Sequence, residues 1–165
     1  WVLLAAAVFV MAVSPWSVVR GQRVHLGRRR TVKKQSGSAR SRGEPVVLVR
    51  HEAPADSPLF RPGTPGAEIH PRILAAAADA PVVAKRHADG FHRTELAQVL
   101  AELGVTHLRI AGMMTQNCVA FTAVSRDAEP YEVSVLSNCV TTVDGNIQQF
   151  ALQALSTRVA VVVDA

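Results

Sequence analysis

The 165-residue sequence predicts an α/β protein with a mostly parallel sheet and helices on both sides of that sheet. Two observations favour this fold class: short, valine-rich apolar runs recur along the chain, and amphipathic stretches separate them. Connections of the strand–helix–strand kind are right-handed and place the strands in parallel. The length suits one domain over 1–165, and a 48% apolar composition is enough to fill a sizeable core.

The first 44 residues are atypical of such a domain. Residues 1–13 are apolar, but a membrane helix needs roughly 20 residues, and no basic segment precedes the run as in a signal peptide. A buried strand over 3–10 is the preferred interpretation, with a clipped signal sequence as the alternative. Residues 14–43 show neither helical nor strand periodicity, so we expect a basic, irregular segment there.

The pattern becomes regular from residue 45 onwards. The sequence predicts a strand at 45–49, a loop rich in Pro and Gly at 53–66, a short helix at 71–78 and a strand at 81–84 that ends at Lys85. Thr94 is expected to cap the next helix, and Gly104 to end it. The apolar face of this helix repeats at helical spacing and comprises Leu96, Val99, Leu100 and Leu103.

The second half continues the alternation. A strand at 105–111 precedes a helix that begins at Thr115 and runs to about residue 128, and a further strand covers 131–136. Asp144 is expected to cap the last helix. One face of that helix comprises Ile147, Phe150, Ala151, Ala154 and Leu155, and the final strand covers 158–163.

Charge and cysteine content narrow the classes of function. Residues 1–44 hold nine Lys/Arg and one acid, whereas residues 45–165 hold nine Lys/Arg and twelve acids, so the net charge of +5 comes from the N-terminal quarter. No nucleic-acid fold motif accompanies this basic segment, so we predict no nucleic-acid partner and keep a nucleic-acid or targeting arm as the alternative. Two cysteines fit a reducing, cytoplasmic environment, and we predict no membrane association.

Cys118 is the strongest candidate for a reactive group. If Thr115 is the helix N-cap, Cys118 is the third helical residue, where unpaired N–H groups and the helix dipole favour a thiolate. Ligands of parallel sheets bind beyond the carboxyl ends of the strands, and Lys85 is also expected there, where its ammonium would add to the effect. The alternatives are a small buried hydrophobe for Cys118 and a surface residue for Lys85.

The other candidate groups carry weaker signals. Cys139 is expected to follow a strand without a helix start beside it, so we interpret it as structural. The six histidines show no spacing typical of a metal site. His51 and His70 flank the loop that could overhang the strand ends, and they are candidates to line a pocket there, with ordinary loop histidines as the simpler interpretation.

Four sequence blocks together resemble a known family. They are RGEPVV (42–47), FRPGTPGAEIHP (60–71), Lys85 with FHRTEL (91–96), and GMMTQNCV (112–119). In this order they are similar to the isochorismatase-like cysteine hydrolases, and the resemblance runs from about Ala39 to the C-terminus. It implies a Rossmann-like three-layer α/β/α fold and a catalytic cysteine, lysine and aspartate.

The resemblance also implies a mechanism and roles for particular residues. Cys118 would attack a C–N bond of a small amide and form a thioester that water hydrolyses. Lys85 would help to hold the thiolate. The Met113–Met114 bond lies where members have a cis peptide bond, and the N–H groups of Met114 and Cys118 would then stabilise the oxyanion.

Further expectations follow from the branch of the family. True isochorismatases lack this nucleophile, so Cys118 points to the hydrolase branch. Metal-binding nicotinamidases carry an Asp-x-His pair after the second strand, whereas this chain has Arg50-His51-Glu52, so we predict no metal and no other cofactor. The substrate would be a small molecule, and members commonly form homo-oligomers. Candidates to contact the substrate are Phe60, Phe91, His51 and Phe121.

One expected residue is missing. Members place the catalytic aspartate directly after the first strand, yet residues 1–43 contain no Asp or Glu, and Met11, Ala12 and Val13 stand at that place. Loss of one member of a catalytic triad commonly costs orders of magnitude in rate. The sequence therefore leaves two interpretations: a hydrolase, intact or impaired, and a catalytically silent protein of the same fold that acts as a binding or interaction module or is a non-functional gene product.

Overall fold

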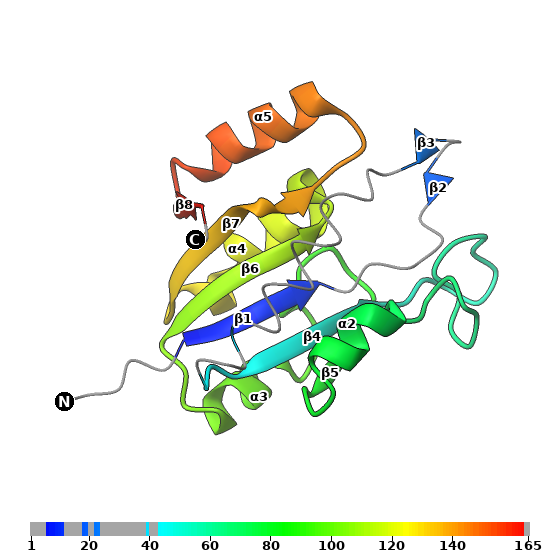
Figure 1. Ribbon diagram of the computed structural model, residues 1–165, viewed down its shortest axis with the longest axis horizontal. Coiled ribbons are helices and arrows are strands. Elements are labelled where there is room, and N and C mark those ends of the chain that lie inside the picture. The colour runs from blue at the N-terminus through cyan, green and yellow to red at the C-terminus, as the bar shows by residue number, and fades with distance from the viewer. Residues whose placement is uncertain (1–5, 12–17, 20–21, 24–38, 40–42, 164–165) are drawn as a thin grey trace.

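The computed structural model describes residues 6–11, 18–19, 22–23, 39 and 43–163. Its centre is a six-stranded sheet in the order β5-β4-β1-β6-β7-β8, in which every described pair of neighbouring strands is parallel. The strands are β1 (Ala6–Met11), β4 (Val46–His51), β5 (Val82–Lys85), β6 (His107–Met113), β7 (Glu132–Thr141) and β8 (Ala160–Val162). In Figure 1 the arrowheads of β1, β6 and β7 point towards the same end of the sheet. This end carries the candidate site.

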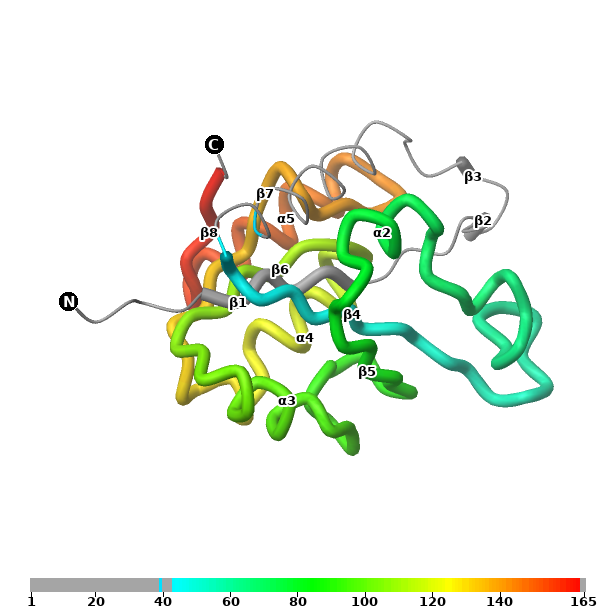
Figure 2. Tube along the Cα trace, turned by 60° about the horizontal axis from the view of Figure 1, so that its bottom comes forward, coloured from blue at the N-terminus to red at the C-terminus, as the bar shows by residue number. Residues whose placement is uncertain are grey.

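Helices cover both faces of the sheet. They are α2 (Pro71–Ala76), α3 (Leu96–Glu102), α4 (Ala120–Ala123) and α5 (Gly145–Leu155), with a π-helical turn η1 (Thr115–Val119) and a 3-10 turn η2 (Arg126–Ala128). Figures 1 and 2 show α2 on one side of the sheet and α3 and α4 on the other. A separate pair of two-residue strands, β2 (Val18–Val19) and β3 (Gln22–Arg23), is antiparallel. The α/β fold with flanking helices is the predicted one.

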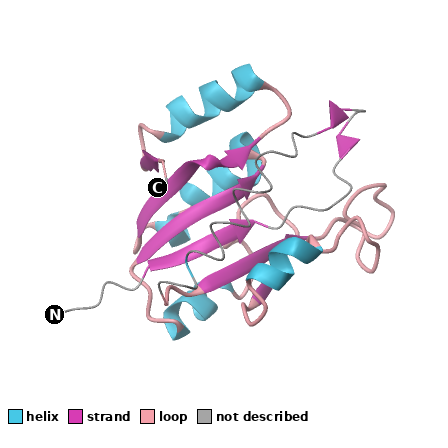
Figure 3. Cartoon of the chain, viewed as in Figure 1, coloured by secondary structure: helices cyan, strands magenta, loops and turns pink. Residues whose placement is uncertain are grey.

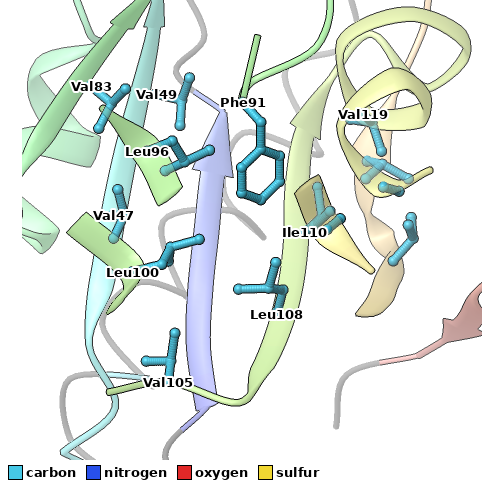
Figure 4. Close-up of a cluster of buried hydrophobic side chains, with 14 of the residues drawn as sticks. Val47, Val49, Val83, Phe91, Leu96, Leu100, Val105, Leu108, Ile110 and Val119 are labelled. Carbon is cyan, nitrogen blue, oxygen red and sulfur yellow. The ribbon is translucent and has the colours of Figure 1, made fainter. Parts of the chain in front are cut away.

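The buried residues of β4 show how the sheet is held between the helices. Side chains alternate between the two faces of a strand. Val47 and Val49 accordingly join the cluster formed with Leu96 and Leu100 of α3 (Figure 4), whereas Leu48 joins a second cluster that contains Ile73 of α2. Because β4 is buried on both faces, it reads in sequence as a continuous apolar run.

The preferred strand at residues 3–10 agrees with β1, which lies between β4 and β6 in the middle of the sheet. Met11 is its last residue and pairs with Val49. Residues 3–5, and most of the segment at 14–43, lie outside the described part of the chain. The carboxyl end of this first strand therefore lies between those of β4 and β6.

Two predicted elements differ from the structure in their extent, and one predicted helix face differs in its packing. The helix expected at 115–128 consists of η1, α4 and η2 in succession. The strand expected at 131–136 continues to Thr141, because a bulge opposite Ile110–Gly112 lets its second half pair with β6 across the polar Ser137-Asn138 pair. The expected apolar face of α5 is packed only in part: Ala151 and Leu155 are buried, together with Gln148, whereas Phe150 is 75% exposed.

The connection between β4 and α2 positions part of the candidate site. Figure 3 shows residues 52–70 as a long loop that extends beyond the carboxyl end of the sheet. Phe60 and Gly63 in this loop adopt positive φ angles of 56° and 75°. None of the helices in the described ranges has the length and apolarity needed to cross a membrane.

Candidate active site

Lys85 and Cys118 meet at the carboxyl end of the sheet. Lys85 is the last residue of β5 and is 1% exposed, although a lysine is rarely buried. Its Nζ lies 3.1 Å from the Sγ of Cys118, in the turn that follows β6. The strand ends thus bring together two residues that are 33 positions apart in the chain.

Backbone carbonyls fix the direction of the lysine ammonium. Nζ donates to the carbonyl oxygen of His87 at 2.7 Å and to that of Ala88 at 3.1 Å, in addition to the contact with Cys118. An ammonium has three N–H donors, so these three acceptors use its whole capacity. Among the described residues, no carboxylate hydrogen-bonds to or ion-pairs with Lys85 or Cys118. Of these three acceptors, the sulfur of Cys118 is the one that belongs to an ionisable side chain.

The turn that carries Cys118 differs in part from the sequence-based expectation. Thr115 is the first residue of η1 and does not cap it. Its buried hydroxyl instead donates to Oε1 of Gln148 at 2.7 Å, and the amide of Gln148 donates to the carbonyl of Val140 at 3.3 Å. Thr115 therefore anchors the start of the helical segment to α5 and β7. The peptide bond between Met113 and Met114 is cis, and Gly112 has a φ of 128°.

His51 and Phe60 lie on the loop side of the site. His51 is paired in register with Lys85 on the neighbouring strand, and its ring is perpendicular to that of Phe60 with the centroids 5.4 Å apart. Burial is the main cause that lowers the pKa of His51 from its ordinary value, followed by the proximity of Lys85 and His87, while Glu52 acts in the opposite direction. His51 is therefore held in its neutral form at neutral pH. Its buried Nδ1 has no hydrogen-bond partner within the described part of the chain.

The other proposed contact residues do not line the same space. Phe91 is buried in the core, where its ring stacks on Tyr131 at 6.3 Å, so a substrate would not reach it (Figure 4). Phe121 is exposed on α4, one turn beyond Cys118. His70 caps α2, with its Nδ1 accepting the N–H of Arg72 at 3.1 Å. Of the residues proposed to contact a substrate, His51 and Phe60 are the two that contact each other.

Cys139 lies inside β7 and not after a strand as expected. It is 1% exposed and packs with Ala111 and Leu136 in the second core cluster. Neither cysteine forms a disulfide bond. Within the described ranges, no group of three or more His, Cys, Asp or Glu residues has a metal-binding arrangement.

Sequence reasoning missed a set of polar residues beside the site. Asp89, Thr122 and Ser125 connect the loop after Lys85 to the helical segment after Cys118. The available signal was the spacing of Thr122 and Ser125, four and seven residues after Cys118, which is the spacing of one face in a regular helix. In the structure, Ser125 lies just after the end of α4.

The protein is thus an α/β protein with a parallel six-stranded sheet. It carries a cysteine in the turn after β6 and a buried lysine at the end of β5. The chain belongs to the isochorismatase family, because the model of the isochorismatase domain matches residues 25–165. This match begins earlier than residue 39, where the recognisable motifs start.

Known proteins show how near the relationship is. The chain is 35% identical over 101 residues to the secreted isochorismatase effector Isc1 of Verticillium dahliae, a match that covers 61% of this chain and 53% of the relative. It is 35% identical over 85 residues to streptothricin hydrolase of Streptomyces noursei, covering 52% of this chain and 33% of the relative. The chain thus spans at most about half the length of these curated relatives.

A solved structure confirms the fold over nearly the whole chain. An isochorismatase family protein from Desulfovibrio vulgaris has a TM-score of 0.86 at 23% identity, with 96% of this chain and 94% of that chain covered. At this level of identity the likeness concerns the fold alone. Streptothricin hydrolase shows that the family includes hydrolases.

Proposed function

We propose that the protein is a cysteine hydrolase that cleaves the C–N bond of a small amide. The observation that carries this proposal is the Lys85 ammonium, which is buried and lies 3.1 Å from the sulfur of Cys118. A buried charge is costly unless it is paired. A thiolate at Cys118 would supply the pairing charge, and a thiolate is the nucleophilic form of cysteine.

The reaction would proceed in two stages. The Cys118 thiolate attacks the carbonyl carbon, a C–S bond forms, and the electron pair of the C=O bond moves to oxygen. We propose the N–H groups of Met114 and Cys118 as donors to this oxyanion. The intermediate then collapses to a thioester and the C–N bond breaks, with a proton from water neutralising the departing amine. The hydroxide left by that water attacks the thioester, the C–S bond breaks, and the carboxylic acid and the Cys118 thiolate are released.

The substrate is expected to enter beneath the loop at 52–70. His51 and Phe60 form an edge-to-face pair on that side, and His51 is in register with Lys85. A neutral imidazole beside an aromatic ring suits a small, uncharged, planar group, because such a group can stack and accept or donate one hydrogen bond. We therefore propose small neutral amides as the substrate class.

The step without an assigned residue is removal of the thiol proton. No acidic residue precedes Glu44 in the chain, and β1 ends at Met11. In this proposal the proton passes to water, and Lys85 stabilises the anion that remains. The hydrolase is then expected to be slow, because a general base contributes typically 10²–10⁴-fold.

The missing carboxylate also supports a second candidate function. A protein of this fold could bind a small ligand at the carboxyl end of the sheet without turning it over. Such a catalytically silent binding protein would keep the Lys85–Cys118 pair only as a structural contact.

One experiment separates the two candidates. Ammonia release from a panel of small primary amides would be measured for the wild type, Cys118→Ala and Met11→Asp, with Ala12→Asp as a second carboxylate variant. The hydrolase proposal expects slow release that Cys118→Ala abolishes and that a restored carboxylate raises by about 100-fold or more. No release from the wild type or from either folded Asp variant would contradict it and support the silent protein.

A further inference from the structure

The helical segment after β6 presents three side chains in succession to the loop that follows Lys85. Cys118 lies in the π-helical turn η1, Thr122 lies in α4, and Ser125 follows α4 as the N-cap of η2. Cys118 contacts Nζ of Lys85, whereas Thr122 and Ser125 bind the loop itself. The reacting pair is thus the first of three attachments between the same two segments.

The second and third attachments are short hydrogen bonds. The N–H of Gly90 donates to Oγ1 of Thr122 at 2.8 Å, and Oγ of Ser125 donates to Oδ2 of Asp89 at 2.7 Å. The other carboxylate oxygen of Asp89 accepts the N–H of Phe91 at 2.8 Å. Asp89 is therefore engaged through both oxygens, and its loop is held against the helical segment at two consecutive residues.

These attachments lie directly beside the acceptors of Lys85. His87 and Ala88, whose carbonyl oxygens receive two of the three ammonium N–H bonds, immediately precede Asp89. A displacement of these carbonyls would turn the third N–H away from sulfur, because the ammonium has no donor to spare. The same ammonium thus joins the carbonyls of this loop to the sulfur of Cys118.

The backbone of Gly90 packs closely against the side chain of Thr122. A Cβ at this position would lie 3.0 Å from Oγ1 and 3.1 Å from Cγ2 of Thr122. A side chain at this position would make a contact tighter than an ordinary van der Waals contact, so glycine suits the close approach of this N–H to the hydroxyl. Thr122 is fully buried, so water does not replace this hydrogen bond.

We propose that Thr122 and the Asp89–Ser125 pair are positioning residues that set the distance between Lys85 and Cys118 and so stabilise the Cys118 thiolate. The inference rests on the proposed function in one respect: Lys85 must stabilise the thiolate. The residues act through Lys85 and do not themselves touch the reacting atoms.

The test measures the rate at which iodoacetamide alkylates Cys118 as a function of pH, with mass spectrometry to identify the modified cysteine. Ser125→Ala is the main variant, because Ser125 is only half-buried and its loss endangers folding least. Thr122→Val removes the buried hydroxyl while keeping the shape, and Thr122→Ser keeps the hydroxyl. Ser156→Ala and Thr157→Val are matched controls, since their hydroxyls donate to carbonyls at the exposed end of α5.

The pH–rate profile is expected to move to higher pH in Thr122→Val and Ser125→Ala. The alkylation rate at pH 7 should then fall by about threefold to tenfold, because a change of about one unit in the pKa of the thiol alters the thiolate population tenfold. Thr122→Ser and both controls are expected to keep the wild-type profile.

Wild-type profiles in Ser125→Ala and in a folded Thr122→Val would overturn the inference, and Ser125→Ala decides alone if Thr122→Val does not fold. Lys85→Met distinguishes this failure from failure of the proposed function. If Lys85→Met moves the profile and Ser125→Ala does not, only the positioning role is wrong. If Lys85→Met has no effect, the proposed activation of Cys118 is wrong as well.

Discussion

Cys118 and Cys139 occupy contrasting environments on neighbouring parts of the same sheet. Cys118 is partly exposed in the turn after β6, with a buried ammonium 3.1 Å from its sulfur. Cys139 lies within β7, is 1% exposed and packs against apolar side chains. A strand end therefore supplies what a strand interior cannot: access to solvent, a helix start, and a charge from another strand.

The difference between the two cysteines has a clear energetic basis. An adjacent cation favours the thiolate, whereas apolar burial disfavours any charged form. The first condition suits a nucleophile, and the second suits a residue that fills the core. Substitutions at these cysteines and at their neighbours should therefore have different consequences.

The largest effect is expected from Lys85→Met, which keeps a side chain of similar length and removes the charge. Because an opposite charge at contact distance favours the ionised form by about one to three pH units, alkylation of Cys118 at pH 7 should slow by about 10- to 100-fold. The modification rate of each cysteine, determined by mass spectrometry, is the measurement. Cys139 is the internal control, and an unchanged rate at Cys118 would show that Lys85 does not activate it.

Gly90→Ala should disturb the surroundings of Cys118 and leave those of Cys139 intact. The added methyl group would lie 3.0 Å from Oγ1 of Thr122, and overpacking of this kind costs about 1–3 kcal/mol. Urea unfolding should show this loss. Gly145→Ala is the matched control, because a Cβ there meets no atom within 4 Å. Equal stability of the two variants would contradict the close contact.

The two cysteines should also differ in their contribution to stability. Cys139→Ala leaves a small cavity in the core and is expected to lower the free energy of unfolding by about 1 kcal/mol. Cys118→Ala is expected to have a smaller effect, within about 0.5 kcal/mol, because its side chain is partly exposed. Urea unfolding of both variants measures this, and a larger loss for Cys118→Ala would reverse the assignment of the structural cysteine.

The smallest effect concerns the pH dependence of stability through His51. Its pKa is lowered in the folded protein by burial first and then by Lys85 and His87, so below about pH 6.5 the unfolded chain binds a proton that the folded chain resists. Stability should therefore fall as the pH drops below this value. His51→Gln should flatten this part of the profile, as followed by urea unfolding between pH 7 and about pH 5. A profile unchanged by the substitution would show that His51 is not held neutral.

The fold class could be predicted from the sequence because each core strand is an apolar run and residues typical of helix ends or turns separate the elements. Gly104 and Asp144 mark helix ends through local chemistry, and local chemistry is visible in sequence. The course of β7 could not be predicted, because its second half pairs with β6 only after a bulge. The packed face of α5 could be predicted only in part. The buried Gln148 forms hydrogen bonds with Thr115 and Val140, whereas the apolar Phe150 is exposed.

The candidate site could also be predicted only in part from the sequence, because part of it depends on tertiary contacts. Cys118 could be found from its place at a helix start, and Lys85 from its place at a strand end. The carbonyls of His87 and Ala88, the hydroxyls of Thr122 and Ser125, and the burial of Phe91 depend on tertiary contacts. Such contacts leave no periodic signal, so a sequence motif suggests the reacting pair but not what holds it.

The pH dependence of alkylation at the two cysteines of the unsubstituted protein tests the activation of Cys118 without any change to its surroundings. Iodoacetamide would be applied between about pH 5 and 10, a range that spans ordinary and activated thiols, and each cysteine followed by mass spectrometry. We expect Cys118 to react at least about 100-fold faster than Cys139 at pH 7. Equal, slow reaction of both cysteines at neutral pH would contradict an activated Cys118.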